Sequence, residues 1–225
     1  MISEKEELWS DMLRRIISER DLHVRWLATL SYLELVGTRK IISFLPAMNC
    51  PLSILQHAAE ESRHASFFKA QIRKLGADPD QPCQLLGGGL AKWYLHRLDQ
   101  WVVRVLKQSD LEEVKIPSVA YLLTTLCVEL RAEWLYPVYE TLLCSMKQPF
   151  SLKGVIREEE QHLRLIREEL ASFSFNPDYE RLIYAEKGLF DDLTDQIALD
   201  LESGALSDRH HSSLPREAST AAFVI

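Results

Sequence analysis

The chain has 225 residues, of which 47% are hydrophobic, and it carries a formal net charge of −7 at pH 7. This length and apolar content allow one domain with a sizeable core. The acidic balance argues against a surface that follows phosphates, which needs clustered Lys and Arg, so nucleic acid is disfavoured as a partner.

The N-terminal segment, MISEKEELWSDMLRRIISER, is charged throughout and lacks the apolar core of a signal peptide. No apolar run approaches the roughly 18 residues that cross a bilayer. The four cysteines, Cys50, Cys83, Cys127 and Cys144, form no Cys-x-x-Cys pair, which disfavours a zinc ribbon or a disulfide framework. We therefore expect a soluble, cytoplasmic protein with reduced thiols.

Good helix formers fill the long segments between only 8 Gly and 9 Pro, and β signals are nearly absent. The expected helices cover about residues 3–44 (broken near Asp21, or one rod), 51–75, 90–108, 116–147, 151–173 and 177–201. Short connectors make neighbouring helices antiparallel, whereas residues 76 to 115 can cross between helix pairs. The sequence therefore predicts an all-α fold, a four-helix bundle with two 2-helix halves, a crossover helix and an extra C-terminal helix.

The last segment, GALSDRHHSSLPREASTAAFVI, is small and polar and has no apolar periodicity until its final residues. We predict one helical domain over residues 1–203 and a disordered tail over residues 204–225. His210 and His211 are therefore expected in a solvated tail rather than at a metal site.

Two Glu-x-x-His pairs carry the main chemical signal: Glu61 with His64, and Glu159 with His162. Residues i and i+3 share one face of a helix, so each pair can offer a carboxylate oxygen and an imidazole nitrogen to one metal ion. Two chance occurrences would not be surprising in a Glu-rich chain, and the Glu that precedes each pair could be a surface salt partner. The helices before the pairs therefore decide the interpretation.

Each half of the chain also has a Glu in an apolar helix upstream of its pair. Glu34 lies 27 residues before Glu61 in LATLSYLELVGTRKII, and Glu129 lies 30 residues before Glu159 in VAYLLTTLCVELRAEWLY. Burying such a carboxylate costs much free energy unless it is protonated, paired or bound to metal. The six expected metal ligands are Glu34, Glu61, His64, Glu129, Glu159 and His162. Oxygen and imidazole donors favour two iron ions, or manganese with iron, over structural zinc.

Four neighbouring residues have two interpretations each. Glu133 competes with Glu129 as a ligand, and we prefer Glu129 because its apolar setting mirrors the helix of the first half. His57, four residues before the first pair, is an alternate ligand or hydrogen-bond partner, although a partly exposed position near a helix start is the favoured interpretation. Tyr136 and Thr125 either line a pocket beside the metals or pack in the core with satisfied hydroxyls.

With these residues the chain resembles the ferritin-like di-iron carboxylate superfamily over about residues 30–170. The matching residues are the two EExxH runs, with Glu34 and Glu129 upstream. Two segments are also similar to helices of the bacterial di-iron tRNA hydroxylases: HAAEESRHASFFKAQIRKLG and CVELRAEWL. The acidic net charge of the chain differs from the basic surface that tRNA binding favours. The resemblance implies a non-haem di-iron oxidoreductase, an oxygenase or hydroxylase that uses dioxygen on a small organic substrate and takes electrons from a separate donor.

Two other functions stay open on the sequence. One is a ferroxidase or peroxidase of ferritin type, which the missing Cys-x-x-Cys pairs and the long segment between the halves disfavour. The other is a metal-free helical binding or scaffold protein. The chain has no G-x-S-x-G motif and no P-loop, so no competing catalytic motif is present. A homodimer is compatible with each of these functions.

Overall fold

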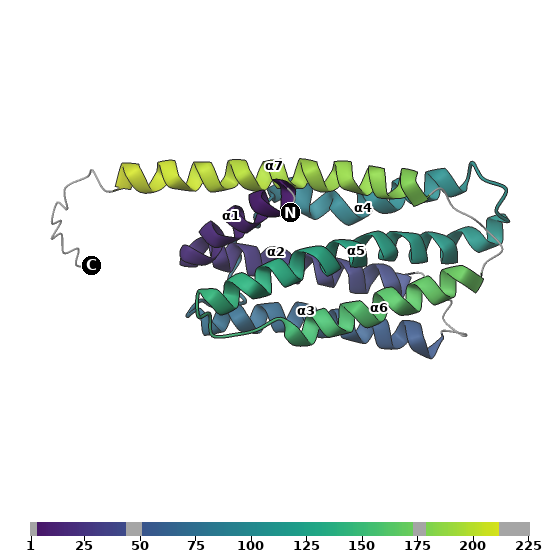
Figure 1. The fold of residues 1–225 in the computed structure, drawn as a ribbon, viewed down its shortest axis with the longest axis horizontal. Helices are drawn as coiled ribbons and strands as arrows, with labels where there is room; N and C mark the ends of the chain where they lie inside the picture. The colour runs from purple at the N-terminus through teal and green to yellow at the C-terminus, as the bar shows by residue number, and fades with distance from the viewer. Residues whose placement is uncertain (1–3, 44–50, 173–178, 212–225) are drawn as a thin grey trace, which may run out of the picture.

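The computed structural model describes residues 4–43, 51–172 and 179–211 (Figure 1). Its elements in chain order are α1 (Glu4–Ser18), α2 (Arg20–Ser43), α3 (Leu52–Lys74), α4 (Gly88–Leu106), a short 3-10 turn η1 (Glu113–Lys115), α5 (Ile116–Ser145), α6 (Lys153–Ser172) and α7 (Tyr179–His211). Every regular element in the described part of the chain is helical, which confirms the all-α prediction. Within those same ranges, none of the helices combines the length and apolar character that a membrane crossing needs.

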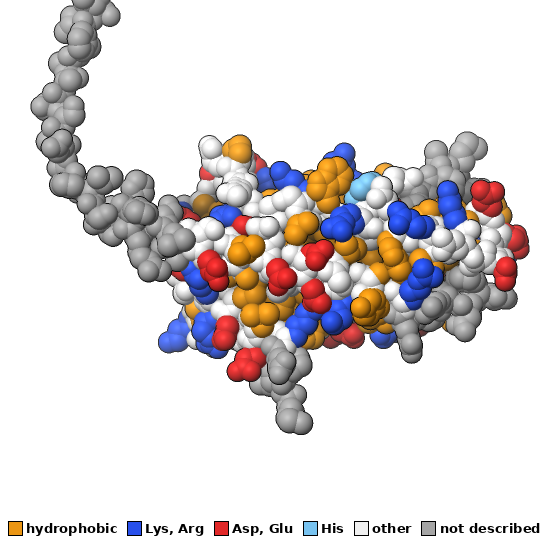
Figure 2. Space-filling model, turned by 90° about the horizontal axis from the view of Figure 1, so that it is seen from above, with side chains coloured by type: hydrophobic (Ala, Val, Ile, Leu, Met, Phe, Trp, Pro, Cys, Tyr) orange, Lys and Arg blue, Asp and Glu red, His pale blue; other side chains and the backbone are white. Residues whose placement is uncertain are grey.

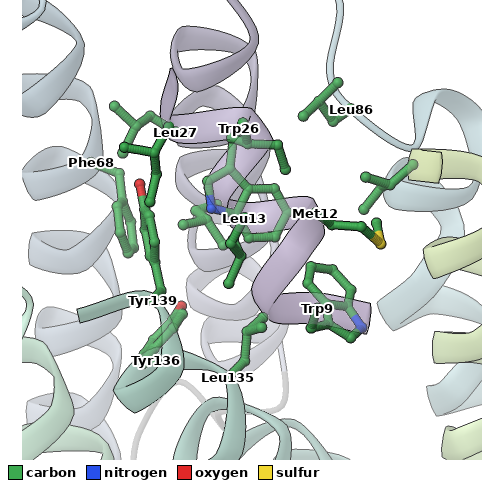
Figure 3. Close-up of a cluster of buried hydrophobic side chains, with 14 of the residues drawn as sticks. Trp9, Met12, Leu13, Trp26, Leu27, Phe68, Leu86, Leu135, Tyr136 and Tyr139 are labelled. Carbon is green, nitrogen blue, oxygen red and sulfur yellow. The ribbon is translucent and has the colours of Figure 1, made fainter. Parts of the chain in front are cut away.

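The sequence left open whether residues 3–44 form one rod, and the structure breaks the segment at Glu19. The Ser18 hydroxyl donates to the carbonyl of Arg15, a local bond that competes with the regular helical pattern. The break turns α1 so that it lies against both α2 and α5. Trp9 and Leu13 thereby reach the core beside Trp26 (Figure 3).

Helix α3 ends close to residue 75, where the sequence predicts its end, and a glycine follows. Gly76 has a φ of 76°, in the left-handed region that glycine favours. Its N–H donates to the carbonyl of Arg73, and the N–H of Ala77 donates to that of Ile72. These two bonds are those of a Schellman motif and satisfy carbonyls that the helix end would leave unpaired.

The last helix differs from the prediction. α7 continues to His211, ten residues beyond the expected end near Leu201, so residues 204–211 of the expected tail are helical. No proline stands in this segment before Pro215 to end the helix. His210 and His211 therefore lie in the last turn of α7, and the rest of the expected tail, residues 212–225, lies outside the described residues.

The helices form two pairs and a covering layer. Short connectors join α2 to α3 and α5 to α6, and each pair packs side by side. Helix α4, which follows the first pair in sequence, packs against α7 (Figure 1), and these two helices cover α2 and α5. On the face of this layer seen in Figure 2, basic, acidic and hydrophobic side chains are interspersed.

Two apolar clusters fill the interior, and a band of acidic residues lies between them. The first cluster surrounds Trp9, whose ring stacks on Phe190 with centroids 5.2 Å apart. Helices α2, α3, α5 and α6 each contribute one residue to the first cluster in the list Leu30, Phe68, Leu135 and Val155. In the same order, they contribute Ile41, Ala58, Cys127 and Ile166 to the second cluster. Between these two positions on each helix lies a glutamate: Glu34, Glu61, Glu129 and Glu159. Four helices thus carry one buried carboxylate each at a common level.

His23 gives the first cluster a pH-dependent stability. Its side chain is 1% exposed, its Nε2 lies 2.6 Å from the Tyr139 hydroxyl, and burial lowers its pKa to about 4. Because the unfolded chain binds this proton at a pKa of 6.5, stability is lost as the pH falls from 6.5 to 4, by about 3 kcal/mol in total. We expect His23→Gln, which cannot titrate, to lose correspondingly less over this range in urea unfolding. Parallel pH curves for the two proteins would contradict the assignment.

Candidate metal centre

The two Glu-x-x-His pairs meet in the interior between α3 and α6. Glu61, His64, Glu159 and His162 are all buried, with exposed fractions of 8%, 2%, 4% and 3%. Helical spacing points each pair inward from its own helix, as the sequence predicts. Glu159 lies between the two imidazoles, since its carboxylate oxygens are 3.1 Å from Nδ1 of His64 and 3.1 Å from Nδ1 of His162.

The outer nitrogen of each imidazole is held by a carboxylate from the other half of the chain. His64 Nε2 donates to Glu158 at 2.8 Å, and His162 Nε2 donates to Glu60 at 2.8 Å. Arg63 also contacts Glu158, at 2.9 Å. Because a carboxylate can only accept, each Nε2 must carry its proton, which leaves Nδ1 as the nitrogen that can face a metal. Glu60 and Glu158 therefore orient the histidines rather than serving only as surface salt partners.

Glu34 and Glu129 complete two overlapping donor groups. Glu34 is 8% exposed and Glu129 3% exposed, in line with their apolar sequence settings. The first group is His57, Glu61, Glu129 and His162, and the second is Glu34, Glu61, His64 and Glu159. Within each group, one donor atom per residue lies within 4.8 Å of the others, so each group could hold a metal ion. Glu61 belongs to both groups and joins them.

His57 is a buried member of the first group, so the favoured interpretation of it as partly exposed is wrong. It is 7% exposed, and its Nδ1 lies 2.7 Å from the Tyr121 hydroxyl, which fixes the ring. Its Nε2 lies 3.2 Å from Glu61 and 3.4 Å from Glu129. The reason is that two side chains of α5 reach the ring across the bundle, the Tyr121 hydroxyl and the Glu129 carboxylate.

Two buried imidazole nitrogens test whether a metal fits this site. His57 Nε2 and His64 Nδ1 form no hydrogen bond of good geometry among the described residues, although a Glu61 oxygen lies 3.2 Å from the first and a Glu159 oxygen 3.1 Å from the second, and both nitrogens face the donor groups. A buried polar atom left without a partner costs about 1–3 kcal/mol. A bound cation would satisfy both nitrogens, so the donor set suits a metal.

The proton balance of the centre supports the same fit. Burial raises the pKa of Glu129 to about 8 and that of Glu61 to about 7, and the charge of Glu159 adds to both shifts. Burial also raises the pKa of Glu34 well above its usual range. Burial lowers the pKa of His162, but hydrogen bonds to Glu129 and Glu159 outweigh it and raise that pKa to about 12. Protons thus offset the carboxylate charges, a role that divalent cations can take over with release of the protons.

The other three neighbours occupy different positions. The Tyr136 hydroxyl donates to Glu34 at 2.6 Å, which orients that carboxylate. Glu133 is exposed and belongs to neither group, whereas Glu129 lies in the first. Four residues turn a helix by 400°, so Glu133 lies about 40° round α5 from Glu129. Thr125 is half-buried and lines the cavity beside the centre.

That cavity extends from the centre towards the covering layer. Its volume is about 120 Å³, and His57, Glu34, Glu61 and Glu129 form one part of its wall. The rest of the wall is mainly apolar and comes from α1, α2, α4, α5 and α7. A small molecule in this space would lie next to the donor groups.

Sequence reasoning missed two features of this region. Tyr121 lies eight residues before Glu129, a spacing that places both on one face of α5 and could have identified it. The second is the buried carboxylate Glu186, to which the half-buried Arg131 donates from Nη2 and Nε at 2.6 and 3.0 Å and the Tyr94 hydroxyl donates at 2.5 Å. Glu186 comes from α7, which the superfamily resemblance does not cover.

Comparison of the chain with models of protein families, with curated proteins and with solved structures found no match.

Proposed function

We propose that this chain is a ferritin-like, non-haem di-metal oxidoreductase that holds two iron ions, or manganese with iron, and uses dioxygen to oxidise a small organic substrate. The observation that carries the proposal is the pair of buried donor groups that share Glu61 and border an apolar cavity. An oxygenase of this class transfers one oxygen atom to its substrate and releases the other as water, consuming two electrons and two protons. A separate electron donor would supply the electrons.

The residues have distinct roles in this proposal. Each donor group would hold one ion, and Glu61 would belong to the donor sets of both. Bound iron would supply the redox chemistry, while the chain fixes the ligands and keeps bulk water away. The Glu60 and Glu158 carboxylates hold His162 and His64 in place, and the Tyr136 hydroxyl restrains Glu34 as the charge of the centre changes.

The cavity favours an organic substrate over the alternative of iron oxidation. Free ferrous ions need polar or acidic groups along their route, since a hydrated cation enters an apolar space at high cost. Here the carboxylates lie at the centre itself, whereas the cavity that reaches it is lined mainly by apolar side chains. The ferroxidase function is therefore the second candidate.

Elemental analysis tests the proposal against a metal-free scaffold. Protein expressed with ample iron is expected to contain about two metal ions per chain, because the centre offers two donor groups. Anomalous scattering at the metal edges of such crystals would identify the ions. Fewer than about one ion per chain in wild type, with His162→Ala unchanged in stability, would remove the metal centre and leave the scaffold function.

A further inference from the structure

We propose that the substrate of this centre is a neutral, largely apolar molecule about the size of benzene, bound in the cavity between the α2 and α5 helices and the covering layer. Its identification as a substrate rests on the proposed function. The binding site itself rests on the walls of the cavity, on the pairing of the charged groups there, and on one glycine.

The walls of the cavity offer hydrocarbon next to the donor groups. Leu33 of α2 and Val128 and Ala132 of α5 are half-buried and line the space beside the carboxylates. Leu135 and Phe190 line it as buried residues of the first apolar cluster. Apolar surface that is removed from water contributes about 25 cal/mol per Å², so these walls favour a hydrocarbon ligand.

The basic groups that line the cavity already have acidic partners. Lys40 Nζ lies 2.5 Å from Asp99, and Arg131 forms its two-bond pair with Glu186. An anionic ligand would have to break one of these pairs, and it would also approach the carboxylates of the centre. A neutral ligand avoids both costs.

Gly37 keeps the cavity open above the centre. It stands inside α2, where glycine is about 1 kcal/mol less favourable than alanine. A Cβ at this position would lie 3.4 Å from Glu61 Oε2, and Gly37 also lines the cavity. A larger side chain here would fill the space between Glu61 and the ligand. The unfavourable helix residue is thus explained by the room that it leaves.

The volume sets the size of the ligand. An engineered apolar cavity of about 150 Å³ binds benzene or xenon. The cavity here measures about 120 Å³, so a single six-membered ring approaches its limit without rearrangement. A fused two-ring molecule or a nucleoside exceeds it.

Binding of fluorobenzene and 4-fluorobenzoate, followed by ¹⁹F NMR on the full chain, tests the proposal independently of catalysis. The measurement can be made on both the metal-free and the zinc-loaded protein, since zinc has no redox chemistry that could turn the ligand over. We expect saturable binding of one fluorobenzene per chain, with 4-fluorobenzoate at least about tenfold weaker because its charge would be buried. Gly37→Leu, and Ala132→Phe from the opposite wall, are each expected to weaken fluorobenzene binding at least about tenfold by filling the space.

Gly188→Leu is the matched control, because it adds the same side chain to another helical glycine with no neighbouring atom within 4 Å. It should leave fluorobenzene affinity unchanged. Unsaturable binding, or equal affinity in all three variants, would overturn the cavity as the binding site, and equal affinity for 4-fluorobenzoate would overturn the neutral class. Fluorobenzene binding in a protein that takes up no metal would leave the cavity site standing and sink the proposed function instead.

Discussion

Glu61→Gln is expected to lose both metal ions together, with affinity at each group reduced more than about hundredfold, and yet to be no less stable than wild type when both proteins are metal-free. Glu61 is the one residue that both donor groups share, so its loss removes a ligand from each. Burial and the charge of Glu159 disfavour its ionised form, raising its pKa to about 7. At pH 8 the neutral amide therefore relieves a cost that the metal-free wild type bears.

The measurements are metal content by elemental analysis and urea unfolding of both metal-free proteins. Glu133→Gln is the matched control, because Glu133 is exposed on α5 and belongs to neither donor group. This variant should still bind two ions. The opposite signs of the two effects distinguish a metal centre from a structural polar network. If Glu61 belonged only to such a network, Glu61→Gln would have the same metal content as wild type. It would instead lower the stability of the metal-free protein.

The helices and the inward residues were predictable from the sequence because both depend on local periodicity. A Glu-x-x-His spacing fixes one face of a helix wherever that helix lies, and the apolar neighbours of Glu34 and Glu129 indicated that their faces are buried. All six expected ligands lie in the two donor groups. The end of α3 likewise lies where the sequence places it, near residue 75, since the two backbone bonds of its cap join residues only three and five positions apart.

The features that were not predictable depend on contacts between distant segments. The burial of His57 depends on Tyr121, 64 residues away in sequence, and the exposure of Glu133 depends on how far α5 is rotated in its layer. Glu186 comes from α7, a helix whose place over α5 no local pattern fixes. The cavity depends on the same layer, so its size and polarity follow only from the assembled fold.

His57→Ala is expected to reduce the metal content from about two ions per chain to about one. The first donor group has two imidazoles and two carboxylates, whereas the second has one imidazole and three carboxylates, so the two positions are not equivalent. Removing His57 leaves the first group with one imidazole, Glu129 and the shared Glu61, and it leaves every member of the second group in place. Titration with Co²⁺, whose visible bands report its ligands, and elemental analysis would measure the loss.

Tyr121→Phe separates ligation from packing at this position. It keeps the ring that packs against His57 but removes the hydroxyl that holds Nδ1, so the first group should bind metal about 10- to 100-fold more weakly while the second is unaffected. His96→Ala, at an exposed histidine on α4, is the control and should retain both ions. If His57→Ala bound two ions with unchanged affinity, His57 would be a core histidine and the groups equivalent. If it lost both ions, the groups would bind metal only as a unit, because Glu61 couples them.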